Sequence, residues 1–208
     1  MKVLIVAGNP DVFPAVKFDK TIGVDYGSLW LLQNDYKCDI AVGDFDSVSD
    51  DEFERILQVS EVVKLQPEKD LTDLEVALDL ALTRFSNAEI TIIGALGGRM
   101  DHELTNIFLP TTAKFREKAE QITLMNSQNH ITYLTAGNHV LSNLTDYNYI
   151  GFMQLETNDL TIENAKYPLK FDENFAAIYA SNEFVSAEMT VKFDKGMLIV
   201  MRSKDKIR

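Results

Sequence analysis

Apolar and polar residues follow two different patterns in the two halves of the chain. In the first half, short unbroken apolar runs alternate with segments whose apolar residues recur at helical spacing. The apolar runs lie at residues 3–7, 21–24, 40–42, 61–65 and 89–93. Unbroken apolar runs are typical of strands buried on both faces, and their alternation with helices predicts a mostly parallel sheet flanked by helices.

Three of the intervening segments carry clear helix signals. Apolar residues recur at helical spacing within 50–59. Thr72 with Glu75 three residues later predicts a capping box at the start of a long helix. A further helix is expected over residues 101–118, with a break or kink at Pro110 because proline lacks the N–H that a helix needs.

The pattern changes after about residue 121, where short strand-like runs are separated by turn residues. The runs lie at 122–125, 130–134, 139–141, 149–155, 160–162, 184–191 and 197–201. Regularly spaced short strands are typical of an antiparallel sandwich. The sequence therefore predicts an α/β domain at 1–120 and an all-β sandwich domain at 121–208.

Aspartates gather where the predicted strands of the first half end. Asp44 and Asp46 follow the run 40–42 directly, and ligands of parallel sheets bind at the carboxyl ends of the strands. Asp70 with Asp73 and the later Asp101 are two further acidic stretches. Carboxylates together with substrate phosphates are the ligands that Mg²⁺ prefers, so we expect a metal and phosphate site here.

Each of these acids also has a simpler interpretation. An Asp-x-Asp pair is ordinary turn chemistry, because aspartate side chains bond to nearby backbone amides. Asp73 and Asp101 stand at predicted helix starts, where the helix dipole favours a carboxylate by about 0.3–1 kcal/mol. Arg99 is explained equally well as a solvated surface charge. The functional interpretation rests on the convergence of the stretches, since they lie far apart in the chain.

Composition and missing motifs narrow the choice of function. The 208 residues carry a net charge of −12, which disfavours binding to duplex nucleic acid. The single cysteine, Cys38, excludes an internal disulfide and a cysteine zinc cage. Neither a P-loop nor a Gly-x-Gly-x-x-Gly fingerprint is present, so another set of loops must hold any nucleotide. No apolar leader or membrane segment is visible, and we expect a cytoplasmic enzyme.

The ordered set of motifs resembles the thiamine pyrophosphokinase family, in its bacterial single-activity form. In the first half the matching motifs are Asp25-x-Gly27, Gly43-Asp44-Phe45-Asp46-Ser47, Asp70-x-Thr72-Asp73, and Gly97-Gly98-Arg99-x-Asp101-His102 followed by Asn106. In the second half they are Tyr167-Pro168-Leu169 and Ser181-Asn182-Glu183-Phe184. The resemblance implies an enzyme that moves a diphosphate from ATP to the hydroxyl of thiamine. It also implies a homodimer that binds thiamine between its subunits.

The resemblance further implies roles for individual residues. The acids implied to hold Mg²⁺ are Asp44, Asp46 and Asp73, and with Asp101 they form the catalytic set. The residues implied at the ATP site are Asp25, Gly27, Ser47, Lys69, Asp70, Gly98, Arg99 and His102. The residues implied to contact thiamine are Ser181, Asn182 and Phe184. Position 69 departs from members of the family that carry a neutral polar residue there.

Two other functions stay open at this point. A metal-dependent phosphohydrolase could use the same acids with water in place of the alcohol. A thiamine- or nucleotide-binding protein without activity would keep binding but lose turnover. The general base also stays open between Asp46 and Asp73.

Overall fold

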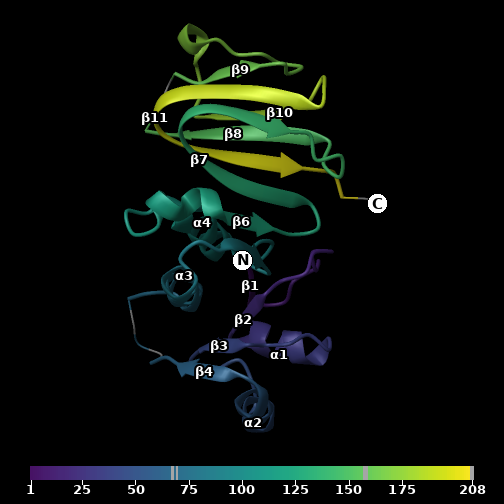
Figure 1. Ribbon diagram of the computed structural model, residues 1–208, viewed down its shortest axis with the longest axis vertical. Coiled ribbons are helices and arrows are strands. Elements are labelled where there is room, and N and C mark those ends of the chain that lie inside the picture. The colour runs from purple at the N-terminus through teal and green to yellow at the C-terminus, as the bar shows by residue number, and fades with distance from the viewer. Residues whose placement is uncertain (67, 69, 157–158, 207–208) are drawn as a thin grey trace. The chain divides into compact units, whose positions relative to one another are not determined.

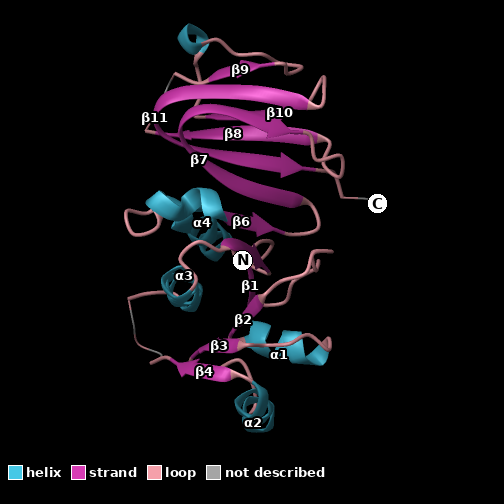
Figure 2. Cartoon of the chain, in the orientation of Figure 1, coloured by secondary structure: helices cyan, strands magenta, loops and turns pink. Residues whose placement is uncertain are grey.

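The computed structural model describes residues 1–66, 68, 70–156 and 159–206. The chain forms two compact units, Met1–Ser127 and Gln128–Arg208 (Figure 1). Figure 2 shows that the longer helices belong to the first unit and that strands dominate the second. The division falls after Ser127, later in the chain than the boundary near residue 120 that the sequence suggested.

The first unit is a parallel sheet with the strand order β6-β5-β1-β2-β3-β4. Its strands are β1 (Lys2–Ala7), β2 (Lys20–Val24), β3 (Ile40–Gly43), β4 (Glu61–Lys64), β5 (Glu89–Ile93) and β6 (Ile122–Met125). Its helices are α1 (Tyr26–Gln33), α2 (Asp50–Val59), α3 (Asp73–Arg84) and α4 (Met100–Phe108). Two 3₁₀ segments follow, η1 (Leu109–Thr111) and η2 (Arg116–Gln121). Four consecutive apolar residues of β1, Val3 to Val6, are fully buried, as the unbroken runs of the sequence predicted.

Two details of the predicted helices are corrected by the structure. The helix expected over 101–118 ends at Phe108, and Pro110 lies in the 3₁₀ segment η1, because proline cannot continue the α-helical hydrogen-bond ladder. Thr72 caps α3 by accepting a hydrogen bond from the Glu75 amide at 3.2 Å. A complete reciprocal capping box lies instead at the start of α2, formed by Ser49 with Glu52.

Strand β6 was assigned to the wrong half of the chain. The sequence placed residues 122–125 in the all-β domain, but β6 pairs in parallel with β5, with Ile90 opposite Ile122. A run of four residues carries no information about strand direction. The crossover through α4 and the 3₁₀ segments sets the parallel direction, because parallel neighbours need a long connection.

The second unit is antiparallel, with the strand order β10-β8-β11-β7 and β9 paired with β11. Its strands are β7 (Asn129–Ser142), β8 (Tyr149–Leu155), β9 (Thr161–Glu163), β10 (Ile178–Asn182) and β11 (Glu188–Ser203), with the 3₁₀ segment η3 (Phe171–Glu173). Strand β11 pairs with β9 through residues 190–192 and with β8 through residues 197–203. One long strand therefore hydrogen-bonds to both β8 and β9 at different points along its length. The buried side chains of the second unit form a hydrophobic core of their own, which includes Phe152 and Phe193.

The sequence predicted four short strands where this unit has two long strands, β7 and β11. The turn signals at Gly137 and Gly196 fall inside β7 and β11, where the register shifts between Phe193 and Met197. Gly196 has a φ of 79°, and an added Cβ would lie 2.2 Å from the Leu155 carbonyl oxygen. A bulge absorbs such residues without ending the strand, which is why the turn signals misled the sequence analysis. Strand β10 was not predicted.

The described part of the chain contains no helix long and apolar enough to cross a membrane.

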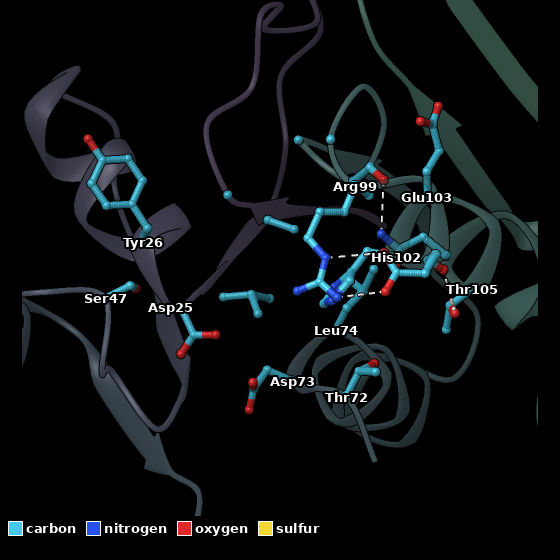
Figure 3. Close-up of a pocket in the computed structure, with 18 residues that line it drawn as sticks. Asp25, Tyr26, Ser47, Thr72, Asp73, Leu74, Arg99, His102, Glu103 and Thr105 are labelled. Atoms are coloured by element: carbon cyan, nitrogen blue, oxygen red, sulfur yellow. Dashed lines mark hydrogen bonds and ion pairs between the residues drawn. The ribbon is translucent and has the colours of Figure 1, made fainter. Parts of the chain in front are cut away.

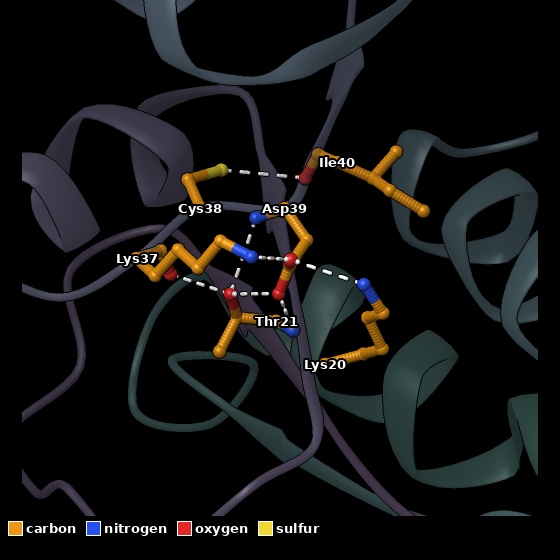
Figure 4. Close-up of polar contacts among 6 residues, drawn as sticks. All are labelled: Lys20, Thr21, Lys37, Cys38, Asp39 and Ile40. Carbon is orange, nitrogen blue, oxygen red and sulfur yellow. Dashed lines mark hydrogen bonds and ion pairs between the residues drawn. The ribbon is translucent and has the colours of Figure 1, made fainter.

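Asp39 fixes β3 against β2 at the amino-terminal ends of these strands (Figure 4). Its carboxylate accepts a hydrogen bond from the Thr21 amide at 3.0 Å and from the Lys20 ammonium at 3.3 Å, and it also pairs with Lys37. The side chain is 8% exposed. Burial raises the pKa of Asp39, but the hydrogen bonds from Lys37 and the Thr21 amide outweigh it and bring the pKa below its usual value.

We expect Asp39→Ala to lower the free energy of unfolding by about 1–3 kcal/mol, because it leaves the Thr21 amide without its acceptor. A depressed carboxyl pKa means that this stabilisation is present above the unfolded-state pKa and is lost as pH falls through the folded-state pKa. Urea titrations at neutral pH and near pH 3 measure both effects. The control is Lys37→Ala, which removes an exposed ammonium and should cost less than about 1 kcal/mol. Equal losses from the two variants would contradict this role of Asp39.

Candidate active site

A cavity of about 660 Å³ opens at the carboxyl ends of the parallel strands of the first unit (Figure 3). The segments after β1, β2 and β5 line it, through Gly8, Asp25 and Gly94 among others. Strand β1 pairs with β2 on one side and β5 on the other, so the chain changes direction across the sheet at this point. Such switch points are where open α/β sheets bind their ligands.

Three helices begin at the cavity. The N-cap positions of α1, α3 and α4 are Asp25, Thr72 and Arg99, and all three residues line the cavity. Of the three side chains, that of Thr72 accepts a capping hydrogen bond. The first N–H groups of a helix have no partner within it, and the helix dipole favours negative charge there. The cavity therefore offers sites for anionic groups, and phosphates commonly bind at such helix starts.

Asp25 carries the most perturbed carboxyl group of the site. Burial, the charge of Asp73 and, to a smaller extent, the charge of Asp44 together raise its pKa to about 7, although the hydrogen bond from the Phe45 amide lowers it. Figure 3 shows Asp25 and Asp73 on the same side of the cavity. The charges of Asp73 and Asp44 therefore oppose ionisation of Asp25, and either a proton on Asp25 or a bound cation would relieve this repulsion.

The turn after β3 presents its two predicted metal ligands differently. Phe45 is buried between them and packs on Phe53 of α2, with ring centroids 4.8 Å apart. Asp44 is half-buried and Asp46 is exposed, and the Asp46 amide donates to the Asp44 carboxylate at 3.2 Å. Neither aspartate lines the cavity, whereas Ser47 does.

The donor chemistry of this region fits a divalent cation. Among the described residues, no three His, Cys, Asp or Glu side chains are grouped as a metal cage. Mg²⁺ does not need such a cage, because it binds through one or two carboxylates and takes its other ligands from water and substrate phosphates. Burial and the charges of Asp73 and Asp44 raise the pKa of Asp25, and a divalent cation bound beside these carboxylates would offset that effect.

Arg99 reaches the cavity from the start of α4. Its guanidinium forms a two-point pair with Asp101, with N–O distances of 2.6 Å and 3.2 Å, and both side chains are exposed. This pairing holds the pKa of Asp101 below its usual value. Asn106 donates to the Ala95 carbonyl oxygen at 2.9 Å and so ties α4 to the loop after β5. Asp101 thus orients Arg99 at the rim of the cavity.

Only some of the remaining residues of the predicted ATP site line the cavity. Gly98 and His102 line the cavity. Gly27 is buried, and an added Cβ would lie 2.0 Å from the backbone of β1, so it allows α1 to begin close to that strand. Asp70 is exposed and does not line the cavity. Lys69 lies outside the described residues.

Several cavity residues were missed by the sequence analysis. Tyr26 and Leu74 stand beside motif residues, while Glu103 and Thr105 lie on α4. Gly8 follows the first apolar run, and this strand end could have been found by the same rule that found Asp44. The positions on α4 depend on where that helix begins, which the sequence does not fix closely enough.

The residues predicted to contact thiamine belong to the second unit. Asn182 is buried, and its side chain exchanges two hydrogen bonds with the backbone of Tyr167, at 2.7 Å and 3.0 Å. Ser181 is exposed with a φ of 59°, and Phe184 packs against the core of the unit. The side chain of Asn182 thus braces the Tyr167 segment, and contacts of these residues with thiamine stay predictions.

Comparison with known families gives this arrangement a context. The family model for the thiamin pyrophosphokinase catalytic domain matches residues 16–124, and the model for its vitamin B1 binding domain matches 138–198.

The chain belongs to the thiamine pyrophosphokinase family.

Relatives of this family match over nearly the whole chain. The thiamine pyrophosphokinase of Bacillus subtilis is 36% identical over 212 residues, which cover 97% of this chain and 98% of the relative. The crystal structure of a thiamin pyrophosphokinase family protein from Enterococcus faecalis matches with a TM-score of 0.94 at 40% identity, covering 99% of this chain and 100% of that one. The thiamin pyrophosphokinase of Candida albicans, at 15% identity, covers 98% of this chain and 90% of its own with a TM-score of 0.74, and shares the fold. The predicted family and fold class are confirmed.

We expect Asp25→Asn to stabilise this thiamine pyrophosphokinase family member at alkaline pH in the presence of EDTA. The folded-state pKa of about 7 lies above the ordinary value of 3.8, so the folded state binds the extra proton and loses stability as pH rises between the two values. Asparagine removes the charge and keeps an acceptor for the Phe45 amide. Thermal unfolding should show a gain of about 2–4 °C or more near pH 8, a smaller gain near pH 5 and little change below about pH 4.

The matched control for this prediction is Asp35→Asn. Asp35 is exposed and also has a positive φ, 60°, but it does not line the cavity. Its substitution should shift the melting temperature equally at all of these pH values. A gain for Asp25→Asn that does not change with pH would contradict the charge repulsion described above.

Proposed function

We propose that this chain transfers a diphosphate group from ATP to the hydroxyl of thiamine, releasing AMP and thiamine diphosphate. The observation that carries the proposal is the cavity of the first unit, which Arg99 and two aspartates, Asp25 and Asp73, line at the starts of three helices. The relatives named as thiamine pyrophosphokinases support the choice of substrates. In this reaction a bond forms between the thiamine oxygen and the β-phosphorus, and the bond from that phosphorus to the AMP oxygen breaks.

The cavity suits the triphosphate of ATP. Helix starts supply N–H groups for phosphate oxygens, and Arg99 supplies a planar fork for two such oxygens. A volume of about 660 Å³ lies within the range of small-molecule sites. Arg99 would have to exchange part of its pairing with Asp101 for phosphate, which its exposure permits.

Asp44, Asp46 and Asp73 are the residues we propose for Mg²⁺. When bound, the ion would neutralise phosphate charge and favour departure of AMP. The residues of the chain would position the ATP and accept the proton of the thiamine hydroxyl. Asp46 and Asp73 are the two candidates for that base, because both are carboxylates of this set.

Thiamine binding is proposed for the second unit, through Ser181, Asn182 and Phe184. The vitamin B1 binding model matches residues 138–198, a range that includes all three. The proposal also includes the homodimer and the cytoplasmic location implied at the level of the sequence.

We expect AMP to form from ATP only when thiamine and Mg²⁺ are both present, and Asp44→Asn to lower kcat by about a hundredfold or more. Chromatographic measurement of AMP and thiamine diphosphate checks both statements. The control is Asp51→Asn, which removes an exposed carboxylate in the first turn of α2 and should leave kcat near the native value.

The same assay separates the alternatives. AMP or phosphate formed equally well without thiamine would indicate a phosphohydrolase. Binding of both substrates without turnover would indicate a non-catalytic binding protein. Native activity in Asp44→Asn would remove the metal assignment of Asp44.

The proposed homodimer has a candidate surface on the second unit. Large apolar side chains are exposed there, including Phe175 at 85% and Phe171 at 67%. Phe175 meets the Tyr179 ring edge-on with centroids 5.3 Å apart, next to the edge strand β10. Exposed aromatic clusters of this kind are typical of protein interfaces.

We expect sedimentation to give twice the 23.5 kDa chain mass, and Phe175→Ser to raise the dimer dissociation constant about tenfold or more. Val16→Ser is the control, because Val16 is an exposed apolar residue of the first unit and should leave the mass unchanged. A native mass of one chain at assay concentration would contradict the dimer. An unchanged dimer in Phe175→Ser would place the interface elsewhere.

A further inference from the structure

We propose that Asp25 is a positioning residue that fixes the turn 43–47, and with it Asp44, rather than a ligand of ATP. The proposal deepens the function given above and rests on it, since Asp44 is one of the proposed metal ligands. It assigns to Asp25 a task different from the nucleotide contact that the family resemblance implied.

The carboxylate of Asp25 contacts both neighbours of Asp44. Its Oδ1 atom accepts a hydrogen bond from the Phe45 amide at 3.2 Å. The same oxygen lies so close to Gly43 that an added Cβ there would approach it to 1.8 Å. Asp44 stands between these two contacts, so the position of its backbone follows the position of Asp25.

The backbone of Asp25 is fixed as well. Its amide donates to the Val42 carbonyl oxygen at 2.9 Å, and its own carbonyl oxygen accepts from the Ser28 amide at 3.0 Å. The first bond joins it to the end of β3, and the second begins α1. Asp25 therefore connects the turn 43–47 to two rigid elements.

Both partners of the Asp25–Phe45 hydrogen bond have unusual backbone angles. Asp25 has a φ of 46° and Phe45 a φ of 63°. Positive φ values are uncommon for residues other than glycine and persist where the surroundings enforce them. The hydrogen bond and the burial of the Phe45 ring against Phe53 are the interactions that hold the turn in this shape.

The backbone of the turn 43–47 also orients the carboxylate of Asp44. The Asp46 amide donates to Asp44 Oδ1 at 3.2 Å, so the side chain of Asp44 is directed by the backbone of the same turn. Loss of the Asp25 contact would free Phe45 and Gly43 and remove the support for this geometry. A displacement of a metal ligand by a fraction of an ångström is enough to slow phosphoryl-type transfer, which depends on positioning.

Two substitutions separate positioning from direct ligation. Asp25→Asn keeps an oxygen for the Phe45 amide but removes the charge. Asp25→Gly removes the side chain while tolerating the positive φ, so that backbone strain does not confuse the result. If Asp25 positions the turn, asparagine should behave like the native residue and glycine should not. If Asp25 binds Mg²⁺ or ATP through its charge, both should fail.

The test combines two measurements on both variants. Hydrogen exchange by NMR reports the protection of the Phe45 amide without any substrate, and Mn²⁺ binding by electron paramagnetic resonance reports the metal site in the presence of a non-hydrolysable ATP analogue. We expect native protection and Mn²⁺ affinity within about threefold for Asp25→Asn, and a loss of about tenfold or more in both for Asp25→Gly. The kcat for AMP formation should follow the same order.

Asp35→Gly is the matched control, since it replaces an exposed aspartate of positive φ away from the cavity and should change neither measurement. Weak Mn²⁺ binding in a folded Asp25→Asn would overturn the proposal, as would native Mn²⁺ binding in Asp25→Gly. If the glycine variant does not fold, Mn²⁺ binding and Phe45 amide protection in Asp25→Asn alone distinguish positioning from direct ligation. Failure of the native protein to form AMP with thiamine would overturn the proposed function, while the exchange and Mn²⁺ measurements would still judge the role of Asp25.

Discussion

Repulsion between carboxylates at one end of a parallel sheet is the constraint on which this site depends. Asp25, Asp44 and Asp73 come from three separate segments, and burial together with the charges of Asp73 and Asp44 raises the pKa of Asp25. Ionisation of a carboxyl group in this position costs stability, and a proton or a bound cation would relieve that cost. The raised pKa of Asp25 thus lowers the stability of the folded protein as pH rises from the ordinary carboxyl pKa to about 7.

The scaffold can tolerate this repulsion because its strands are held firmly elsewhere. The core of β1 is fully buried, and Asp39 secures β2 and β3 at the end of the sheet away from the cavity. The turns at the other end carry the unusual backbone angles, at Asp25 and Phe45. Rigid strands with strained turns at their ends are how a sheet presents side chains in fixed positions.

Much of the first unit could be predicted from sequence, because buried strands and capped helices leave local signals. The errors arose where local signals compete with long-range pairing. Gly137 and Gly196 look like turns, yet the pairing of β7 with β11 carries both strands through them. β6 could not be assigned to its sheet, because four apolar residues do not record the direction of their partner.

By itself, the sequence determined the alternation of elements, the acidic strand ends and the family, since these are written in residue types and their order. The tertiary structure decided which strand ends share a cavity, that Ser47 faces it while Asp44 and Asp46 do not line it, and that Asp25 bonds to the Phe45 amide. The physical reason is that hydrogen bonds and charge coupling between distant segments depend on distances of a few ångströms. Strand register and backbone angles set those distances, and no short stretch of sequence encodes them.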